Sequence, residues 1–226
     1  MAARGAFISL DGVDGGGKTG AIAALQERLV RDGYDVLLTR EPGGTEPGLA
    51  LRRLLLAENS FDWTPRAELL LMNAARAQHV ERVIRPAVAA GRIVLCDRYV
   101  AASLAFQGAG RGLPVEEILD LHRIATDDLW PDLAVILDID VRRGLERSRR
   151  RNAAAGLDEG RFEALDLDFH ERVRRSYLDQ AARWPERYTV IDAAGTEAEV
   201  RKAVQETVLA LLSDRASGSG SVRPKK

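Results

Sequence analysis

The stretch that decides the fold lies near the start of the chain and runs Gly12-Val13-Asp14-Gly15-Gly16-Gly17-Lys18-Thr19. It fits the pattern G-x-x-x-x-G-K-[ST] at every fixed position. An apolar run typical of a buried strand precedes it at residues 6–11, and a run typical of a helix follows it at residues 21–29. Strand, glycine-rich loop and helix in this order predict a phosphate-binding loop rather than an ordinary glycine-rich turn.

Each residue type in this loop suits phosphate binding. Glycines adopt backbone angles closed to other residues and let N–H groups approach phosphate oxygens. The helix that follows adds partial positive charge at its N-terminus. Lys18 can reach the outer phosphates of a nucleoside triphosphate, and the Thr19 hydroxyl can bind Mg²⁺.

The bulk composition indicates one globular domain without a membrane or nucleic-acid partner. The chain has 226 residues, with 33 Lys and Arg against 34 Asp and Glu, and this balance gives no electrostatic attraction to nucleic acid or lipid. Its single cysteine, Cys96, excludes an internal disulfide and fits a reducing compartment. No run is apolar enough to span a bilayer and no signal-peptide layout is present, so we expect a cytoplasmic protein. Residues 1–213 are expected to form the domain, and residues 214–226 a flexible tail.

Short apolar runs alternate with helical segments along the chain. The runs are at residues 6–10, 36–39, 93–96, 133–139 and 188–191. Helices are predicted at residues 21–31, 47–57, 65–89, 115–126, 142–151, 162–184 and 197–212. Continuous apolar runs are typical of parallel strands covered on both faces, so the pattern predicts a doubly wound α/β sheet. Ligands should bind beyond the carboxyl ends of the strands, where the phosphate loop lies.

The third strand ends in Asp97 and Arg98, at the same edge of the sheet as the phosphate loop. An acidic residue after a buried strand is typical of a position that holds Mg²⁺ beside such a loop. Metal binding is our preferred interpretation of Asp97, and capping of the next helix is the alternative. Arg98 would face the same crevice, where an anion is its natural partner. Asp138 and Asp140, after the fourth strand, are interpreted as capping and turn residues.

The loop after the second strand contains Arg40 and Glu41 followed by Pro-Gly-Gly-Thr, a composition typical of a shaped loop. Two interpretations stay open, namely a positioned ion pair or phosphate contact, and a solvated loop. Arg52 and Arg76 stand on predicted helices that are otherwise rich in alanine and leucine. If buried, each needs an anionic partner such as a ligand. If exposed, each can extend its charged end into water.

The predicted helix at residues 142–151 is strongly basic, and small residues follow it at 152–156. Three interpretations are possible: a mobile lid over about residues 142–162, a solvated helix face, and a nucleic-acid surface. No aromatic residue interleaves with the arginines, which argues against nucleic acid. An arginine placed on developing phosphoryl charge can raise a rate by about 10³ to 10⁵.

Several segments between residues 7 and 193 carry a specific combination of motifs. They are residues 11–19, Thr39-Arg40-Glu41-Pro42-Gly43-Gly44-Thr45, Ala74-Ala75-Arg76-Ala77-Gln78, Asp97-Arg98-Tyr99, Ala105-Phe106-Gln107-Gly108-Ala109-Gly110-Arg111-Gly112 and Phe169-His170-Glu171-Arg172-Val173. In order and spacing this combination resembles the bacterial thymidylate kinase family. The resemblance implies the P-loop fold of nucleoside monophosphate kinases, with a five-stranded parallel sheet flanked by helices and a mobile lid.

The resemblance also implies an activity, namely transfer of the ATP γ-phosphoryl group to the 5′-phosphate of dTMP with Mg²⁺ as cofactor. By position, the ATP-binding residues are Gly12, Val13, Asp14, Gly15, Gly16, Gly17, Lys18 and Thr19. The implied catalytic residues are Lys18, Arg98, Arg147, Arg149 and Arg151, and the implied metal ligands are Thr19 and Asp97. The implied acceptor-binding residues are Asp14, Arg40, Arg52, Met72, Arg76, Arg98, Ser103, Phe106, Gln107 and Glu163.

Finer roles follow from the same resemblance. Arg76 and Arg98 are expected to clamp the dTMP phosphate. Ser103 and Gln107 are expected to face the thymine, and Phe106 to disfavour a ribose 2′-hydroxyl. Members with glycine in place of an arginine at the position of Gly15 resemble the type whose catalytic arginines come from the lid. Family members are commonly homodimers, so a homodimer is expected here.

The acceptor-base site departs from the family pattern. Met72 stands where phenylalanine is common, Ala101 and Ala102 replace polar residues, and Phe106 replaces tyrosine. These differences motivate two alternatives to a dTMP kinase: a kinase for another nucleoside monophosphate or a deoxynucleoside, and a catalytically weak nucleotide-binding paralogue.

Overall fold

The computed structural model describes residues 5–57, 61–155 and 160–217, with the side chains of 151–155 outside the description. Its strands form one all-parallel sheet in the order β2-β3-β1-β4-β5. The strands are β1 (Ala6–Gly12), β2 (Val36–Arg40), β3 (Ile93–Asp97), β4 (Leu133–Asp138) and β5 (Tyr188–Asp192). The five strands predicted from the sequence are confirmed. Because β1 is central, the loop that follows it lies in the middle of the carboxyl edge.

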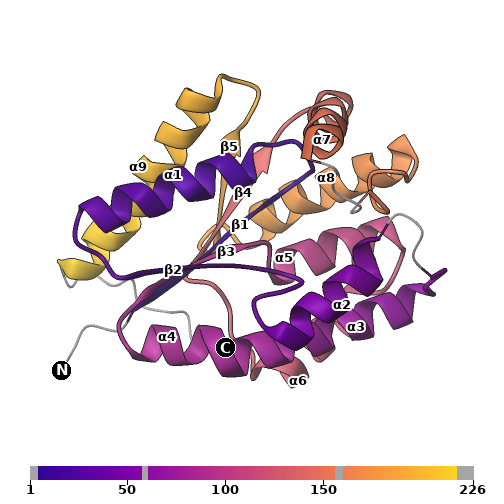
Figure 1. Cartoon of the computed structure of the whole chain (residues 1–226), viewed down its shortest axis with the longest axis horizontal. Helices are drawn as coiled ribbons and strands as arrows, with labels where there is room; N and C mark the ends of the chain where they lie inside the picture. The colour runs from indigo at the N-terminus through magenta and orange to yellow at the C-terminus, as the bar shows by residue number, and fades with distance from the viewer. Residues whose placement is uncertain (1–4, 58–60, 156–159, 218–226) are drawn as a thin grey trace.

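Helices cover both faces of this sheet, and Figure 1 shows α1 and α9 side by side along one of them. The helices are α1 (Lys18–Arg31), α2 (Glu46–Leu56), α3 (Pro65–His79), α4 (Arg85–Ala89), α5 (Val100–Ser103), α6 (Val115–Thr126), α7 (Val141–Ala155), α8 (Leu167–Arg183) and α9 (Glu197–Ala216). Two stretches of π-helix, η1 (Val80–Ile84) and η2 (Leu104–Gly110), continue α3 and α5. Within the described ranges, no helix combines the length and the apolar character needed to cross a membrane.

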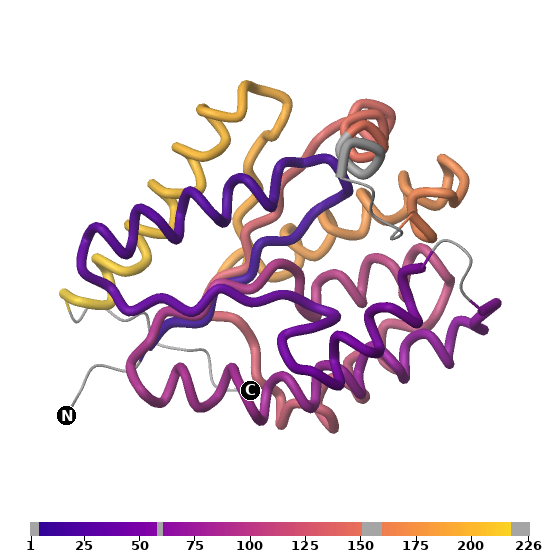
Figure 2. The backbone as a smooth tube through the Cα atoms, viewed as in Figure 1, coloured from indigo at the N-terminus to yellow at the C-terminus, as the bar shows by residue number. Residues whose placement is uncertain are grey.

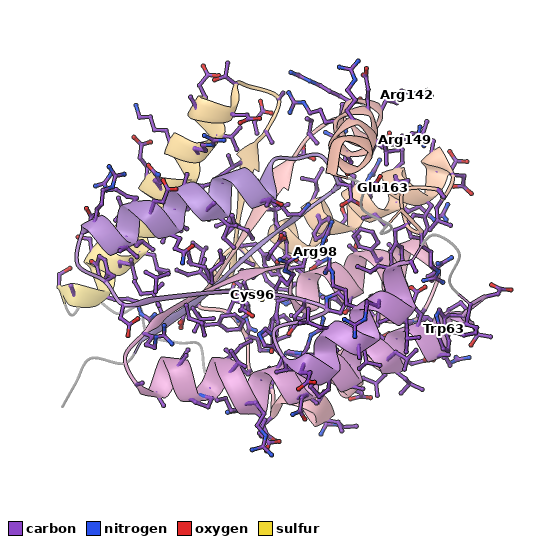
Figure 3. All side chains as sticks on the ribbon, in the orientation of Figure 1. Trp63, Cys96, Arg98, Arg142, Arg149 and Glu163 are labelled. Carbon is purple, nitrogen blue, oxygen red and sulfur yellow. The ribbon has the colours of Figure 1, made fainter. Side chains whose placement is uncertain are left out.

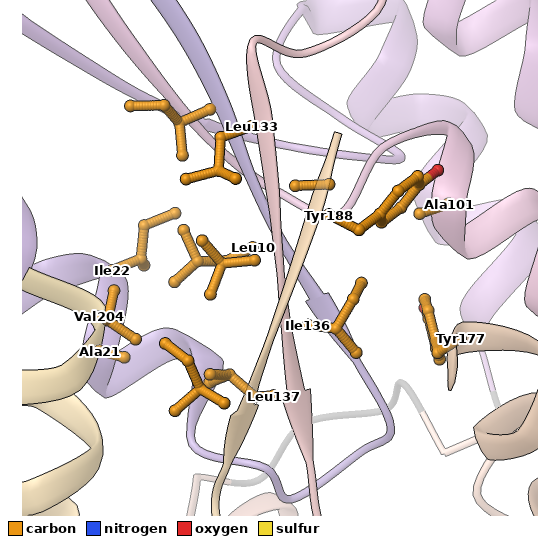
Figure 4. Close-up of a cluster of buried hydrophobic side chains, with 14 of the residues drawn as sticks. Leu10, Ala21, Ile22, Ala101, Leu133, Ile136, Leu137, Tyr177, Tyr188 and Val204 are labelled. Carbon is orange, nitrogen blue, oxygen red and sulfur yellow. The ribbon is translucent and has the colours of Figure 1, made fainter. Parts of the chain in front are cut away.

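The core lies on both sides of the central strands, as Figure 4 shows. Leu10 packs toward α1 and α9 through Ile22 and Val204, whereas Ile136 packs on the other side near Tyr177. Successive residues of a strand point to opposite faces, so a continuous apolar run fills both halves. Each such leucine or isoleucine contributes about 1.5–3 kcal/mol by burial. This core holds the carboxyl edge of the sheet rigid, and the site is built there.

Residues 100–110 form α5 and η2, although the sequence predicted no helix there. Glycines at 108 and 110 lower local helix propensity. A Cβ at Gly110 would come within 2.6 Å of the Phe169 ring on α8, so close packing between η2 and α8 requires glycine there. A tertiary contact thus overrides the local propensity.

The structure also refines three predictions about helices. The predicted helix at 65–89 is continuous but passes through η1 just before Pro86, whose ring and missing N–H disturb regular α-helical bonding. The predicted helix at 162–184 begins only at Leu167, because the Asp166 side chain caps it through the Phe169 N–H at 2.6 Å. Residues 214–216 of the expected tail are helical, and Arg215 pairs with Asp132 at 3.0 Å. Residues 218–226 lie outside the described residues.

Candidate active site

A cavity of about 570 Å³ lies at the carboxyl edge of the sheet. Its size is that of a typical small-ligand site. The phosphate loop and the ends of β2 and β3 line it, together with α2, α3, η2 and the segment before α8. The predicted site residues among its lining are Asp14, Gly15, Gly17, Lys18, Thr19, Arg40, Arg52, Met72, Arg76, Asp97, Arg98, Ser103, Phe106, Gln107 and Glu163. The fold therefore brings most of the predicted site into one space.

Lys18 lies in the first turn of α1 and is buried against the phosphate loop. Its Nζ donates to the backbone oxygens of Gly12 and Val13 at 3.0 and 2.8 Å. Burial, together with the nearby cation of Arg98, lowers the pKa of the Lys18 ammonium to about 8, although Asp14 and Asp97 oppose this shift. A bound anion would offset the cost of burying the charged ammonium, so the site suits an anionic ligand.

The phosphate loop packs directly against the start of α7, and Figure 2 shows the turn between β1 and α1 beside it. Gly15 has φ +76°, and a Cβ there would lie 1.9 Å from the Gly144 carbonyl oxygen. A Cβ on Gly144 would in turn lie 2.4 Å from the Asp14 carbonyl oxygen. Both glycines are needed because two backbones touch here. An arginine at position 15 would require α7 to move away.

Gly15→Ala is therefore expected to lower kcat at least about tenfold, because displacing the loop misplaces its phosphate-binding N–H groups. The measurement is the steady-state rate of ADP release. Gly33→Ala is the matched control, since Gly33 has a similar φ of +88° but nothing within 4 Å of an added Cβ. Gly33→Ala introduces similar backbone strain without the steric clash, so its kcat should be unchanged. Equal kcat values for the two variants would show that the contact with α7 is unimportant.

Arg98 connects the end of β3 to the phosphate loop. Its guanidinium donates to the Gly12 carbonyl at 3.0 Å, to the Tyr177 hydroxyl at 3.2 Å and to the Asp14 carboxylate at 2.5 Å. It also lies over the Phe106 ring, 5.0 Å from the centroid. Burial is the largest single effect and disfavours its charge, but the surrounding acidic groups, with Asp14 first among them, together outweigh burial and raise the pKa of Arg98. Its φ of 70° is unusual for a residue other than glycine, and such strain clusters at functional positions.

Asp97 has the properties of a metal ligand. It ends β3 and lines the cavity with Thr19, and its buried Oδ1 receives no hydrogen bond within the described part of the chain. Among the described residues, no group of three or more His, Cys, Asp or Glu is placed to hold a metal ion. Mg²⁺ beside a nucleotide uses one or two protein ligands together with phosphates and water, so these two residues fit it.

Glu41 pairs with Arg76 rather than with its neighbour Arg40. The buried Glu41 carboxylate accepts from Arg76 Nε at 2.7 Å and is 3.0 Å from His79 Nδ1. Arg40 is exposed at the cavity, and Arg52 donates to the Pro42 carbonyl at 3.1 Å. The ion-pair interpretation thus holds for Glu41, which joins the loop to α3, whereas Arg40 is exposed.

Arg76 and Arg98 both line the cavity but bond to different groups. Arg76 Nη2 donates to Ser103 Oγ at 3.0 Å and to the Tyr99 carbonyl at 3.3 Å, whereas Arg98 contacts the phosphate loop. Among the described residues, the hydrogen bonds of the two guanidiniums share no partner. The joint clamp on one phosphate stays a prediction, and the structure places Arg76 beside Ser103, a residue expected to face the base.

Comparison with known proteins agrees with this geometry. The sequence model of the family described as "Thymidylate kinase" matches residues 10–204. Thymidylate kinase from Cereibacter sphaeroides is 56% identical over 201 residues, which cover 89% of this chain and 93% of that protein. Thymidylate kinase from Desulfovibrio desulfuricans is 47% identical, covering 94% and 99% of the two chains.

The chain belongs to the thymidylate kinase family. A crystal structure of thymidylate kinase from Ehrlichia chaffeensis has a similar fold, with a TM-score of 0.71 and 30% identity over 92% of this chain and 99% of that one. The predicted P-loop fold and the resemblance to this family are thereby confirmed. The individual roles of the site residues stay predictions.

In this thymidylate kinase family member, Arg147 and Arg149 of α7 do not line the cavity. Arg147 donates to the Ala193 carbonyl and Arg149 to the Glu163 carbonyl, each at 3.4 Å. Ser148 donates to the Glu163 carboxylate at 2.5 Å, which ties α7 to the cavity wall. Figure 3 shows Arg149 near Glu163, with Arg142 farther out. The side chain of Arg151 and residues 156–159 of the expected lid lie outside the described part.

The two acidic residues after β4 differ from each other. Asp140 accepts from the Arg143 N–H at 3.1 Å and so caps α7, as predicted. Asp138 instead forms two hydrogen bonds with Arg174 of α8, at 2.7 and 2.9 Å. The capping prediction for Asp138 is wrong, because α8 crosses the sheet at that point and supplies a cation that the sequence could not place.

Sequence reasoning missed three residues behind the cavity wall of this family member. They are Glu68, Arg111 and Arg161, which form ion pairs at 3.0 and 2.7 Å. A signal for Glu68 was present, because Glu68, Met72 and Arg76 recur every four residues and share one face of α3. No short-range sequence pattern links Arg111 and Arg161 to Glu68.

Proposed function

We propose that the protein transfers the γ-phosphoryl group of ATP to the 5′-phosphate of dTMP, giving ADP and dTDP. The observation that carries this proposal is the joint cavity, in which a buried phosphate loop with Lys18 faces a second set of basic and aromatic residues. A hydrolase would need no second nucleotide site of this kind. The family assignment and the residues that line the cavity agree with this reaction. No observation favours a different acceptor or a catalytically weak paralogue.

Phosphoryl transfer depends chiefly on positioning and charge. The ATP phosphates would lie on the loop N–H groups and Lys18. Arg98 stands between that loop and the acceptor, where it would bind the dTMP phosphate in line with the donor. Asp14 would contact the acceptor sugar, and Ser103 and Gln107 the base. Because Arg76 is held beside Ser103, we assign it to the base end.

We further propose Mg²⁺ as the cofactor, held by Asp97 and Thr19. When bound, it would neutralise charge on the ATP phosphates. Arg147, Arg149 and Arg151 would approach the transferring group only after α7 closes, since Arg147 and Arg149 bond elsewhere in this structure.

A coupled assay of ADP release tests the reaction. dTMP, dUMP, dCMP, AMP, GMP and CMP are supplied separately as acceptors, with ATP and Mg²⁺. We expect the highest kcat/KM with dTMP, and loss of turnover with EDTA that excess Mg²⁺ restores. Turnover with dTMP no better than with AMP, GMP or CMP would contradict the proposal. Nucleotide binding without any ADP release would favour the silent paralogue.

The lowered pKa of Lys18 predicts pH-dependent ATP binding. In the nucleotide-free protein Lys18 has a pKa of about 8, and bound phosphate favours the charged form. The Kd for ATP is expected to rise by up to about tenfold per pH unit above pH 8. Below pH 8, the ionisation of Lys18 should leave this Kd unchanged. Isothermal titration calorimetry at pH 7, 8 and 9 measures this effect, with Lys18→Ala as the variant that lacks it. A Kd for the unmodified protein that is unchanged from pH 8 to 9 would contradict the prediction.

The sign of the stability effect follows from the same pKa. An unfolded lysine titrates near 10.5, so the unfolded chain binds more protons than the folded chain between pH 8 and 10.5. Lys18 therefore makes the nucleotide-free protein more stable as pH rises through that window.

We also propose that the protein is a cytoplasmic homodimer. The family resemblance suggests dimers, and large apolar side chains are exposed on the packed pair α3 and α6, where Leu70 is 54% and Ile124 is 70% exposed. Sedimentation velocity would give about twice the 24.7 kDa of one chain. A single species at the mass of one chain would exclude the dimer.

A further inference from the structure

The Glu68 carboxylate lies behind the cavity wall and is fully buried. It accepts hydrogen bonds from three side chains, two from η2 and its C-terminal end and one from the segment before α8. Arg161 Nη1 donates at 2.7 Å, Arg111 Nη2 at 3.0 Å, and the side-chain amide nitrogen of Gln107 at 2.9 Å. Gln107 lines the cavity, whereas Glu68 and Arg111 do not. Glu68 can therefore act on a ligand only through its neighbours.

The charges around Glu68 settle which way the Gln107 amide points. Two guanidiniums pair with this carboxylate, and a carboxylate can only accept hydrogen bonds. Gln107 must therefore turn its Nε2 toward Glu68, because the reverse orientation would place two acceptor oxygens about 2.9 Å apart. Assignment of a glutamine amide is often ambiguous, but here the charged partner decides it.

The other end of the Gln107 amide is then available to the cavity. No hydrogen bond from the described residues reaches its Oε1, and this atom is not fully buried. Gln107 therefore presents its amide oxygen to the cavity as an acceptor. Met72 and Phe106 line the same wall, so a flat base can lie against them.

We propose that Glu68 is a positioning residue that holds the Gln107 amide with its oxygen toward the acceptor base, and thereby makes the site select bases with an N–H at ring position 3. Thymine and uracil carry that N–H, whereas N3 of cytosine is an acceptor and would oppose the Gln107 oxygen in the same pose. The proposal rests on the proposed function, and it identifies the source of the discrimination between dTMP and dCMP.

Glu68→Gln tests this role with almost no change of shape. The new amide can donate as well as accept, so the Gln107 amide is free to turn either way. We expect the ratio of kcat/KM for dTMP to that for dCMP to fall at least tenfold, with a KM for ATP within about threefold of the unmodified protein. If Glu68 had a purely structural role, Glu68→Gln would lower kcat/KM for dTMP and for dCMP by the same factor and leave the ratio unchanged.

Two further variants keep the test decisive. Glu117→Gln is the matched control, because Glu117 also accepts two hydrogen bonds from an arginine, Arg66, but at the surface away from the cavity. It should leave the ratio unchanged. Glu68→Asp keeps the charge between the two arginines but withdraws the acceptor from Gln107. Glu68→Asp replaces Glu68→Gln in the test if circular dichroism shows that Glu68→Gln is unfolded. The ratio of kcat/KM for dTMP to that for dCMP should fall in Glu68→Asp as well.

A double-mutant cycle separates direct from indirect action. If Glu68 acts through Gln107, Glu68→Gln should not change the ratio further in a Gln107→Leu background. The positioning role is overturned if the ratio of kcat/KM for dTMP to that for dCMP is unchanged in the folded single variants. It is also overturned if Glu68→Gln lowers this ratio equally in the Gln107→Leu background. In both cases the proposed function still holds, provided that the unmodified protein turns over dTMP. Failure of the unmodified protein to use dTMP overturns both this role and the proposed function.

Discussion

Replacing Lys18 with alanine is expected to lower kcat for dTMP phosphorylation by at least about 10²–10³-fold. The physical reason is that Lys18 is a buried cation held on the phosphate loop by two backbone carbonyls, and its charge is aimed where negative charge gathers in the transition state. The variant should fold, because it removes a buried charge whose pKa shows a desolvation cost at neutral pH. ADP release under saturating ATP and dTMP is the measurement.

The control for this variant is Lys202→Ala. Lys202 is on α9 and 74% of its side chain is exposed beside Glu206, so its removal should leave kcat unchanged. A thermal melt of each variant shows that both are folded. If folded Lys18→Ala protein kept the normal kcat, the loop would not be the donor site.

The second large effect is expected for Arg98→Gly, which should lower kcat/KM for dTMP by about 10²–10³-fold. Glycine is the better replacement than alanine here, because the φ of 70° at Arg98 is freely available to glycine. The change removes bonds to Gly12, Asp14 and Tyr177 and leaves the Asp14 carboxylate without this cation. The side chains of Arg98 and Asp14 are 19% and 17% exposed, and losing one partner of such a half-buried charge pair costs up to about 2–5 kcal/mol.

Arg174→Ala provides the comparison for Arg98→Gly. Arg174 also binds a carboxylate through two N–H groups, those of Asp138, but it does not line the cavity. Kinetics with dTMP varied at saturating ATP, and then with ATP varied at saturating dTMP, separate the two substrates. We expect the loss in Arg98→Gly mainly with dTMP. A kcat/KM within threefold of normal in a folded protein would exclude a role for Arg98 at the acceptor phosphate.

Local chemistry explains why much of the fold could be predicted. The phosphate loop was recognisable because its glycines have φ values that few other residues adopt, as at Gly15 and Gly17. Parallel strands read as continuous apolar runs, so β1 to β5 were found within two residues of their limits. Asp97 followed from its place after β3 beside that loop.

Partners distant in the chain could not be predicted in the same way. Glu41 could bond to Arg40 next to it, but Arg76, 35 positions away, takes that place because α3 packs over the loop after β2. Similarly, Asp138 binds Arg174 because α8 crosses the sheet at the end of β4. The arginines at 147 and 149 have the spacing of a catalytic lid, yet they bond to Ala193 and Glu163 in this structure.

The amino-acid sequence alone was therefore enough for the P-loop fold, the donor-phosphate site and the family, since these depend on backbone angles, apolar periodicity and short-range spacing. Only the tertiary structure decided which groups each arginine bonds to and which atom of Gln107 faces Glu68. The reason is that a buried charge takes the partner that the packing brings within about 3 Å, and sequence separation carries no information about that distance.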